Sequence, residues 1–94
     1  MYPVSYPRIA NLNMTNAATE YPISLPEQTK MVTIKARSKD SELQLAYEQG
    51  KSGSEFITIS AGTVKTLEGA WLNFTTLYLQ SSNPNEVAEV EIWT

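Results

Sequence analysis

Cysteine and histidine are both absent from this 94-residue chain, so closely spaced carboxylates are its first candidates for acid–base chemistry. Glu89 and Glu91 lie two residues apart, so on an extended strand both side chains point to the same face, and Glu86 is nearby. Glycosidases also use two carboxylates, but they hold them across a cleft and on separate elements. Two glutamates on one face of one strand are typical of a solvated surface, and we interpret them in that way.

No nucleophile, metal ligand or phosphate loop emerges from the remaining residues. Without histidine, the neighbours Ser38-Lys39 and Lys51-Ser52 are the nearest approach to an activated serine, and both lie in turn-like segments. Asp40 is the only aspartate, so no segment carries the ligand pattern of a calcium loop. The lysine and glycines near residue 50 lack the spacing of a phosphate-binding loop. The sequence therefore predicts a protein that is not an enzyme and uses no metal, no cofactor and no small-molecule substrate.

Positive charge is concentrated in one segment of a chain whose net charge is −3. That net charge disfavours nucleic acid as a partner, because nucleic-acid binding needs a dense cationic face. Lys35 and Arg37 share one face of a predicted strand, between Lys30 and Lys39. They either pair across strands with acidic residues such as Glu89 and Glu91, the commoner arrangement, or contact an acidic partner surface.

From residue 21 onward, apolar residues alternate with polar ones, the pattern of half-buried β-strands. The runs that alternate are 32–37, 42–47, 56–60, 76–80 and 88–93. Turn-like segments separate them, at 38–41, 49–54, 61–63, 68–70 and 82–85. Residues 64–72 suit a loop or a short strand better than a helix, because Gly69 and several β-branched residues interrupt them. We expect an all-β fold: a single small antiparallel β-sandwich or jelly-roll-like domain over residues 17–94.

Residues 1–16 differ from the rest, because they contain two prolines and show neither a strand nor a helix period. We expect an extended N-terminal arm that lies on its own domain or on a neighbour. Its apolar residues are the candidate contacts: Tyr2, Tyr6, Ile9, Leu12 and Met14. The segment has no signal-peptide pattern, and no stretch of the chain is apolar enough for a membrane helix, so we expect no membrane association.

Trp71 and Trp93 are the aromatic residues of most interest. We interpret them as side chains that pack at a sheet edge or at a contact between subunits. The alternative is a sugar-binding surface, which requires that at least two of four aromatic residues be exposed on the same face: Tyr47, Trp71, Tyr78 and Trp93.

A series of short motifs over residues 17–94 resembles the small structural proteins of tailed-bacteriophage virions, of the kind that decorate or cement the capsid. The motifs are Glu20-Tyr21-Pro22, Leu25-Pro26, Lys30, Ala36-Arg37, Leu45-Ala46-Tyr47, Gly50, Phe56-Ile57-Thr58-Ile59, Ala61-Gly62, Leu77-Tyr78-Leu79-Gln80-Ser81 and Glu89-Val90-Glu91-Ile92-Trp93. The resemblance implies a β-sandwich or jelly-roll-like fold, an N-terminal arm, frequent trimers and no catalytic residue.

The expected function is therefore that of a virion structural protein, assembled in the cytoplasm of the host bacterium, that binds and stabilises the capsid shell. Its expected partners are the major capsid protein or other virion proteins and further copies of itself, as a trimer. The candidate partner-binding residues are Tyr2, Tyr6, Ile9, Leu12, Met14, Lys35, Arg37, Trp71 and Trp93. The alternative is a carbohydrate- or receptor-binding module of a phage fibre or tail.

Overall fold

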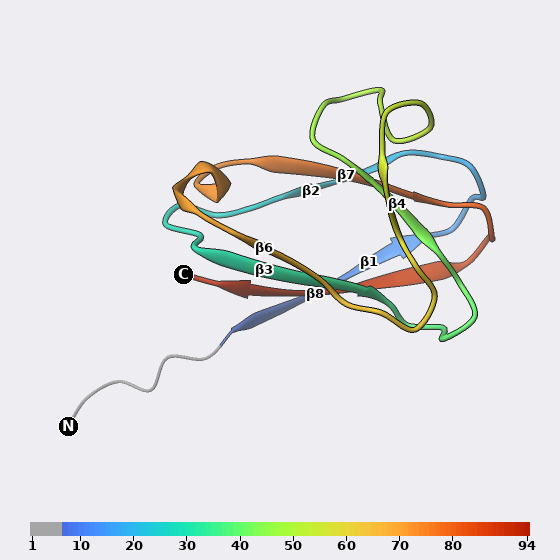
Figure 1. Ribbon diagram of the computed structural model, residues 1–94, viewed down its shortest axis with the longest axis horizontal. Helices are drawn as coiled ribbons and strands as arrows, with labels where there is room; N and C mark the ends of the chain where they lie inside the picture. Colours follow the sequence, from blue (N-terminus) through green and yellow to red (C-terminus); the bar gives the residue numbers. More distant parts are fainter. Residues whose placement is uncertain (1–6) are drawn as a thin grey trace.

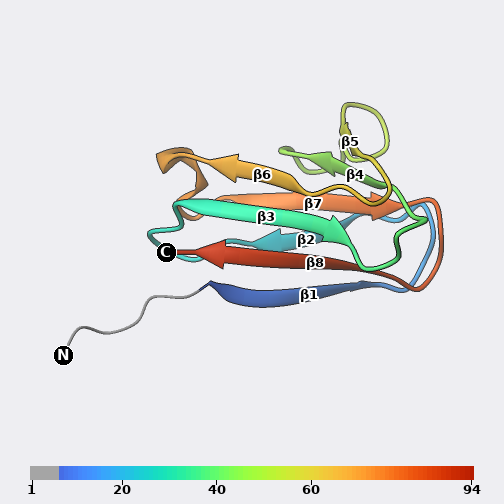
Figure 2. The same cartoon turned by 60° about the horizontal axis from the view of Figure 1, so that its bottom comes forward.

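A computed structural model describes residues 7–94, and within them the chain forms two four-stranded antiparallel sheets packed face to face (Figures 1 and 2). The strands are β1 (Arg8–Met14), β2 (Tyr21–Ser24), β3 (Met31–Ala36), β4 (Leu43–Ala46), β5 (Ile57–Ile59), β6 (Lys65–Glu68), β7 (Thr76–Ser81) and β8 (Glu86–Trp93). One turn of 3-10 helix, η1 (Ala70–Leu72), follows β6. The all-β antiparallel sandwich expected from the alternating runs is confirmed.

The order of the strands is that of a jelly roll. One sheet has the order β1-β8-β3-β6 and the other has the order β2-β7-β4-β5. The pairs β1–β8, β2–β7, β3–β6 and β4–β5 are those of one long hairpin, and successive pairs lie in alternate sheets. Rolling a long hairpin in this way closes a core between two sheets while every strand keeps antiparallel neighbours.

The core lies between the sheets and contains the inward residues of the predicted runs. Its buried hydrophobic members include Val32, Ile34, Leu43, Leu45, Ile59, Leu77, Leu79, Ala88, Val90 and Ile92. The alternation fails at two positions that the pattern had placed with the inward residues. Tyr47 and Ile57 are each 42% exposed, because β4 ends at Ala46 and β5 starts at an open sheet edge.

The expected boundary between an arm and a domain at residues 16 and 17 is wrong for residues 8–14. These residues form β1, which pairs along its whole length with β8, from Arg8 opposite Ile92 to Met14 opposite Glu86. Met14 is fully buried in the core, and Leu12 packs against it. The strand period is present over residues 10–14, where Ala10, Leu12 and Met14 alternate with two asparagines, and it was missed because the outward-facing Ile9 breaks the pattern at the start of the strand. Residues 1–6, which include Tyr2 and Tyr6, lie outside the described residues.

Residues 64–72 contain the short strand that the sequence allowed, β6, followed by the single turn η1. Gly69 connects the two with φ 130° and ψ 162°, a backbone conformation that is essentially restricted to glycine. This sharp change of direction leaves Leu72 in the core and Trp71 on the surface.

Candidate binding site

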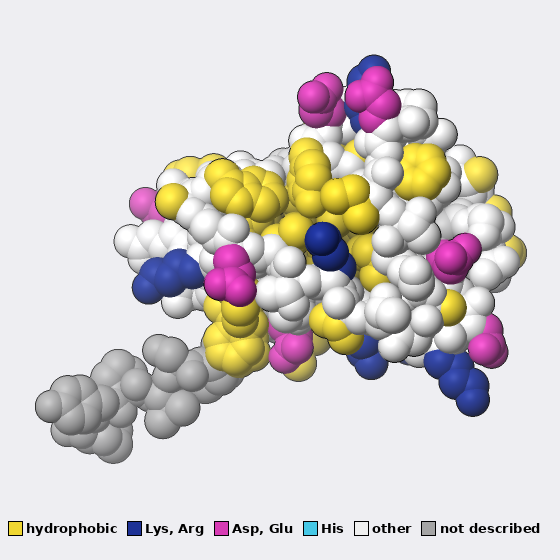
Figure 3. Space-filling model, in the orientation of Figure 1, with side chains coloured by type: hydrophobic (Ala, Val, Ile, Leu, Met, Phe, Trp, Pro, Cys, Tyr) yellow, Lys and Arg dark blue, Asp and Glu magenta, His cyan; other side chains and the backbone are white. Residues whose placement is uncertain are grey.

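Two aromatic rings from distant parts of the chain meet on the surface. Tyr47 follows the last residue of β4, and Trp71 lies in η1; their ring centroids are 5.5 Å apart and their planes stand at 89°. Tyr47 is 42% exposed and Trp71 is 48% exposed. In Figure 3, hydrophobic side chains gather over η1 and over the neighbouring side of the sandwich, between β6 of one sheet and β4 of the other. An exposed aromatic pair is the kind of feature that protein and sugar interfaces use.

Trp71 is held in place although its ring is exposed. Its Nε1–H donates to the Glu68 carbonyl oxygen at 2.9 Å, and its own carbonyl accepts a hydrogen bond from the Thr75 hydroxyl. The indole also covers Gly69 so closely that a Cβ there would lie 2.7 Å from Trp71 Cδ1. Because the indole N–H is already satisfied, the apolar part of the ring is what remains available for a ligand.

Tyr47 lines a hollow with Glu48, Lys51 and Glu55, and burial raises the pKa of its phenol. An ion pair joins Lys51 Nζ and Glu55 Oε1 at 3.7 Å. Charged groups therefore lie beside the aromatic pair on the side of Tyr47.

Glu20 ties the loop that follows Tyr47 to the body of the domain. Its two carboxylate oxygens accept hydrogen bonds from the backbone N–H of Gly50 at 2.7 Å and of Ser52 at 3.0 Å. The Ser52 side chain, followed by these two N–H groups, lowers the pKa of Glu20 below its ordinary value. The Tyr47 side of the site thus rests on an anchored loop.

The cationic residues on β3 are paired within the molecule. Lys35 Nζ lies 3.4 Å from Glu89 Oε1, and Arg37 Nε donates to Glu89 Oε2 at 3.0 Å. The Arg37 hydrogen bond, with a smaller contribution from Lys35, lowers the pKa of Glu89. The interpretation as cross-strand pairs is confirmed for Glu89, whereas Glu91 accepts a hydrogen bond from the Thr33 hydroxyl at 3.1 Å instead.

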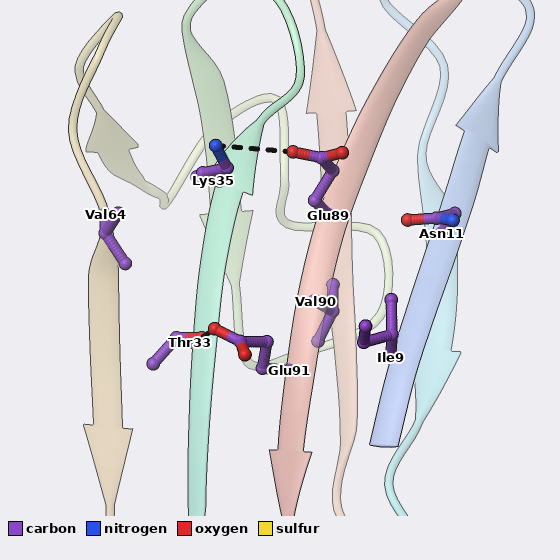
Figure 4. Close-up of a pocket in the computed structure, with 8 residues that line it drawn as sticks. All are labelled: Ile9, Asn11, Thr33, Lys35, Val64, Glu89, Val90 and Glu91. Atoms are coloured by element: carbon purple, nitrogen blue, oxygen red, sulfur yellow. Dashed lines mark hydrogen bonds and ion pairs between the residues drawn. The ribbon is translucent and has the colours of Figure 1, made fainter. Parts of the chain in front are cut away.

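A hollow of about 210 Å³ crosses the outer face of the β1-β8-β3-β6 sheet (Figure 4). Ile9 on β1 and Val64, just before β6, stand at its two sides, with Thr33, Lys35, Glu89 and Glu91 between them (Figure 4). The polar side chains on its floor bond mainly to one another, which leaves Ile9, 71% exposed, as its most accessible apolar group.

The candidate contacts of the N-terminal segment divide between surface and core. Ile9 points to solvent, Leu12 is half-buried, and Met14 is buried in the core, where it cannot meet a partner. Met14 is therefore corrected from a partner contact to a core residue. The expectation failed because alternate residues of a paired strand point to opposite sides.

Trp93 lies at the end of β8 opposite Met31 on β3, and it is half-buried; because β8 lies between β1 and β3, Trp93 is not on an edge strand. Its indole Nε1 is buried and has no hydrogen-bond partner among residues 7–94. The structure does not bring Trp93 together with Trp71 as an aromatic contact within that range.

Sequence reasoning missed two residues of the aromatic site as contacts. Tyr47 entered only through the sugar-binding alternative, and Gly69 was treated as a turn residue. The spacing of Gly69 and Trp71 was the available signal, since a ring that folds back over the backbone needs a position without Cβ.

Among residues 7–94 the structure holds no group of three or more acidic side chains placed to bind a metal ion. In the same range, no helix has both the length and the apolar character needed to cross a membrane.

Comparisons with known proteins support the fold but identify no family for this chain. No family model matches the chain, and no curated protein matches it. A de novo designed double-stranded β-helix, solved in solution by NMR, is similar in structure with a TM-score of 0.61 at 16% sequence identity. The match covers 90% of this chain and 97% of the designed one. At that identity the likeness concerns the fold alone, and it agrees with the jelly-roll strand order.

Proposed function

We propose that this chain is a non-catalytic structural protein of a tailed-bacteriophage virion, which binds and stabilises the capsid shell as a decoration protein. The resemblance of residues 17–94 to such proteins is one support, and a jelly roll is a fold that capsid-associated proteins use. The proposed partners are the major capsid protein or another virion protein, together with further copies of this chain.

The observation that carries the proposal is the exposed and anchored Trp71. A tryptophan left half in water gives up part of the hydrophobic stabilisation that burial would provide. Here the ring is nevertheless fixed, by its bond to Glu68, by Tyr47 and by the surface of Gly69. A rigid exposed tryptophan needs little ordering on binding, and tryptophan is enriched among the residues that contribute most to binding at protein interfaces.

The relative orientation of the two rings favours a protein partner. Because the planes of Tyr47 and Trp71 are perpendicular, they form a notch and not a continuous flat surface. A notch suits a protruding side chain or loop. Lys35 and Arg37 contribute less than expected from the sequence, since both already pair with Glu89.

Co-sedimentation of the purified chain with capsids that lack it tests this proposal. Replacing a hot-spot tryptophan typically costs about 2 kcal/mol or more of binding free energy, so Trp71→Ala should weaken capsid binding by about 30-fold. Phe56→Ala is the matched control, because it also removes an exposed aromatic side chain, 38% exposed, that makes no aromatic contact with the pair. Equal binding by the Trp71→Ala variant and the wild type would refute the proposed site.

The contribution of the N-terminus needs a deletion that spares β1. Removing residues 2–16 would remove β1 and the core residue Met14, so any loss of capsid occupancy would reflect unfolding. Removing residues 2–6 leaves β1 intact. If occupancy is unchanged in that variant, Tyr2 and Tyr6 do not bind the capsid.

A carbohydrate-binding function is the second candidate. It requires two exposed aromatic residues on one face, and Tyr47 and Trp71 are both exposed and adjacent. The free face of the indole can stack on a sugar ring, and Glu48 and Lys51 lie beside Tyr47 to bond hydroxyl groups. Glycan-array binding that disappears in Trp71→Ala, without capsid binding by the wild type, would select this function over the first.

A further inference from the structure

The four edge strands of the sandwich differ in how well they are protected against pairing with another strand. Edge strands are usually kept apart by shortness, proline or charge. Within residues 7–94, β5 has three residues, β2 has four with Pro22 among them, and β6 has four with Lys65 and Glu68 at its ends. β1 has seven residues, no proline, and no charge after its first residue, Arg8.

We propose that β1 pairs in antiparallel fashion with β1 of a second copy of this chain, joining two four-stranded sheets into one sheet around a two-fold axis. One side of β1 bonds to β8, and among the described residues no strand lies on its other side. That free side presents backbone N–H and C=O groups that a second strand can satisfy. The end of the sheet formed by β1 is seen in Figure 2.

The alternation of β1 determines the register of this pairing. Ala10, Leu12 and Met14 face the core, whereas Ile9, Asn11 and Asn13 face outward. Directly opposed residues must lie on the same face, so the two residue numbers of each pair must sum to an even number. Only the register that places Asn11 opposite Asn11 of the other copy pairs all seven residues of β1.

In this register β1 is complementary to itself. Arg8, its only charged residue, lies opposite Met14 and meets no like charge. Half-buried Leu12 lies opposite Ala10, which extends the two cores side by side. On the outer face Ile9, 71% exposed, gains cover from Asn13 of the other copy. A second copy is therefore the occupant that the strand itself fits.

The pairing also ends after two copies. Both outer edges of the combined sheet are then β6, a short strand with a charged residue at each end, and these features disfavour pairing with a third copy. Antiparallel pairing of identical strands is an isologous contact, which gives a closed dimer. This differs from the trimer that the resemblance implies. The inference does not depend on whether the chain binds a capsid or a sugar.

The mass of the full chain in solution is the first test. Sedimentation or light scattering over a range of concentrations should show twice the mass of one chain at the higher concentrations. A monomer throughout, or a trimer, would overturn the proposal.

Single cysteines then test the register, which is possible because the chain has no cysteine of its own. Opposed residues of antiparallel strands have Cα atoms about 4.5–5.5 Å apart, within the range of a disulfide. Asn11→Cys should form a disulfide-linked dimer under oxidising conditions. Asn13→Cys is the control, since its two cysteines would lie four residues apart along the strand, about 13 Å. Cross-linking at residue 13 in preference to residue 11 would refute the register.

A charge variant tests the same contact without oxidation. Asn11→Lys places two like charges opposite each other across the two-fold axis and should shift dimerisation to at least tenfold higher concentration. Asn13→Lys adds the same charge on the same face but opposite Ile9, so it should have a smaller effect. Circular dichroism confirms that both variants fold. A dimer that is equally stable in Asn11→Lys and the wild type would exclude β1 self-pairing. Pairing of β1 with a different protein, without self-association of this chain, would exclude it as well.

Discussion

The ring of Tyr47 stands at 89° to the indole of Trp71, with 5.5 Å between the ring centroids. This edge-to-face contact joins the end of β4 to η1, the turn that carries the chain from β6 in one sheet to β7 in the other. Such contacts contribute about 0.5–1.5 kcal/mol beyond the area they bury. The pair therefore also fixes the turn between the two sheets against the end of β4, and the backbone at Gly69 is what allows it.

Gly69→Ala should displace the indole of Trp71. The added Cβ would lie 2.7 Å from Cδ1, and φ 130° is unfavourable for alanine, so we expect a loss of about 2–4 kcal/mol in unfolding free energy. Denaturant unfolding followed by circular dichroism measures this loss.

A second glycine and a double variant separate the two causes. Gly50→Ala shares the positive φ, at 82°, but has nothing within 4 Å of the new Cβ. It should cost about 1 kcal/mol. In a Trp71→Ala background Gly69→Ala should lose only its backbone contribution. An equal loss in both backgrounds would show that the indole does not contact residue 69 as described.

Met14→Ala should destabilise the domain by about 2–5 kcal/mol, because it leaves a cavity in the core between the sheets. Ile9→Ala is the matched control, since Ile9 lies on the same strand but points outward and is 71% exposed. It should change stability by less than about 0.5 kcal/mol. Equal small effects in thermal unfolding would mean that residues 8–14 are not part of the domain.

Stability should fall in acid because of Glu89. Its pKa is lowered by Arg37 and then Lys35, so its contribution is present above the ordinary glutamate pKa of about 4.3 and is lost as pH falls through the lowered value. Glu89→Gln should reduce stability at neutral pH and flatten its decline with acid.

Glu91→Gln is the control for that pH profile, because it leaves both ion pairs of Glu89 in place. Unfolding free energies from pH 7 down to about pH 2 provide the comparison. An acid decline equally steep in Glu89→Gln and the wild type would remove Glu89 as its cause.

Trp93→Phe should cost little, within about 1 kcal/mol, since it removes a buried N–H that lacks a partner among the described residues. The same change at Trp71 breaks the bond to the Glu68 carbonyl and should cost more. Chemical denaturation ranks the two variants. A larger loss at residue 93 would mean that its N–H is satisfied in the folded protein.

The sequence by itself determined the secondary structure of most of the chain. Alternation in Val32 and Ile34, in Leu77 and Leu79, and through β8 identified both the strands and their inward faces. The same parity placed Lys35 and Arg37 together on one face of their strand. These features are local, because side-chain direction in a strand depends only on position along it.

Only the tertiary structure decided which strands are neighbours and what each edge exposes. Period-two alternation assigns a face but no partner, so it could not place β1 beside β8 or bury Met14. It could not bring Tyr47 to Trp71 either, because that contact joins residues far apart in the chain. The accessibility of an edge strand or of an aromatic ring depends on which elements lie beside it. These neighbours are fixed only when the long hairpin rolls into two sheets.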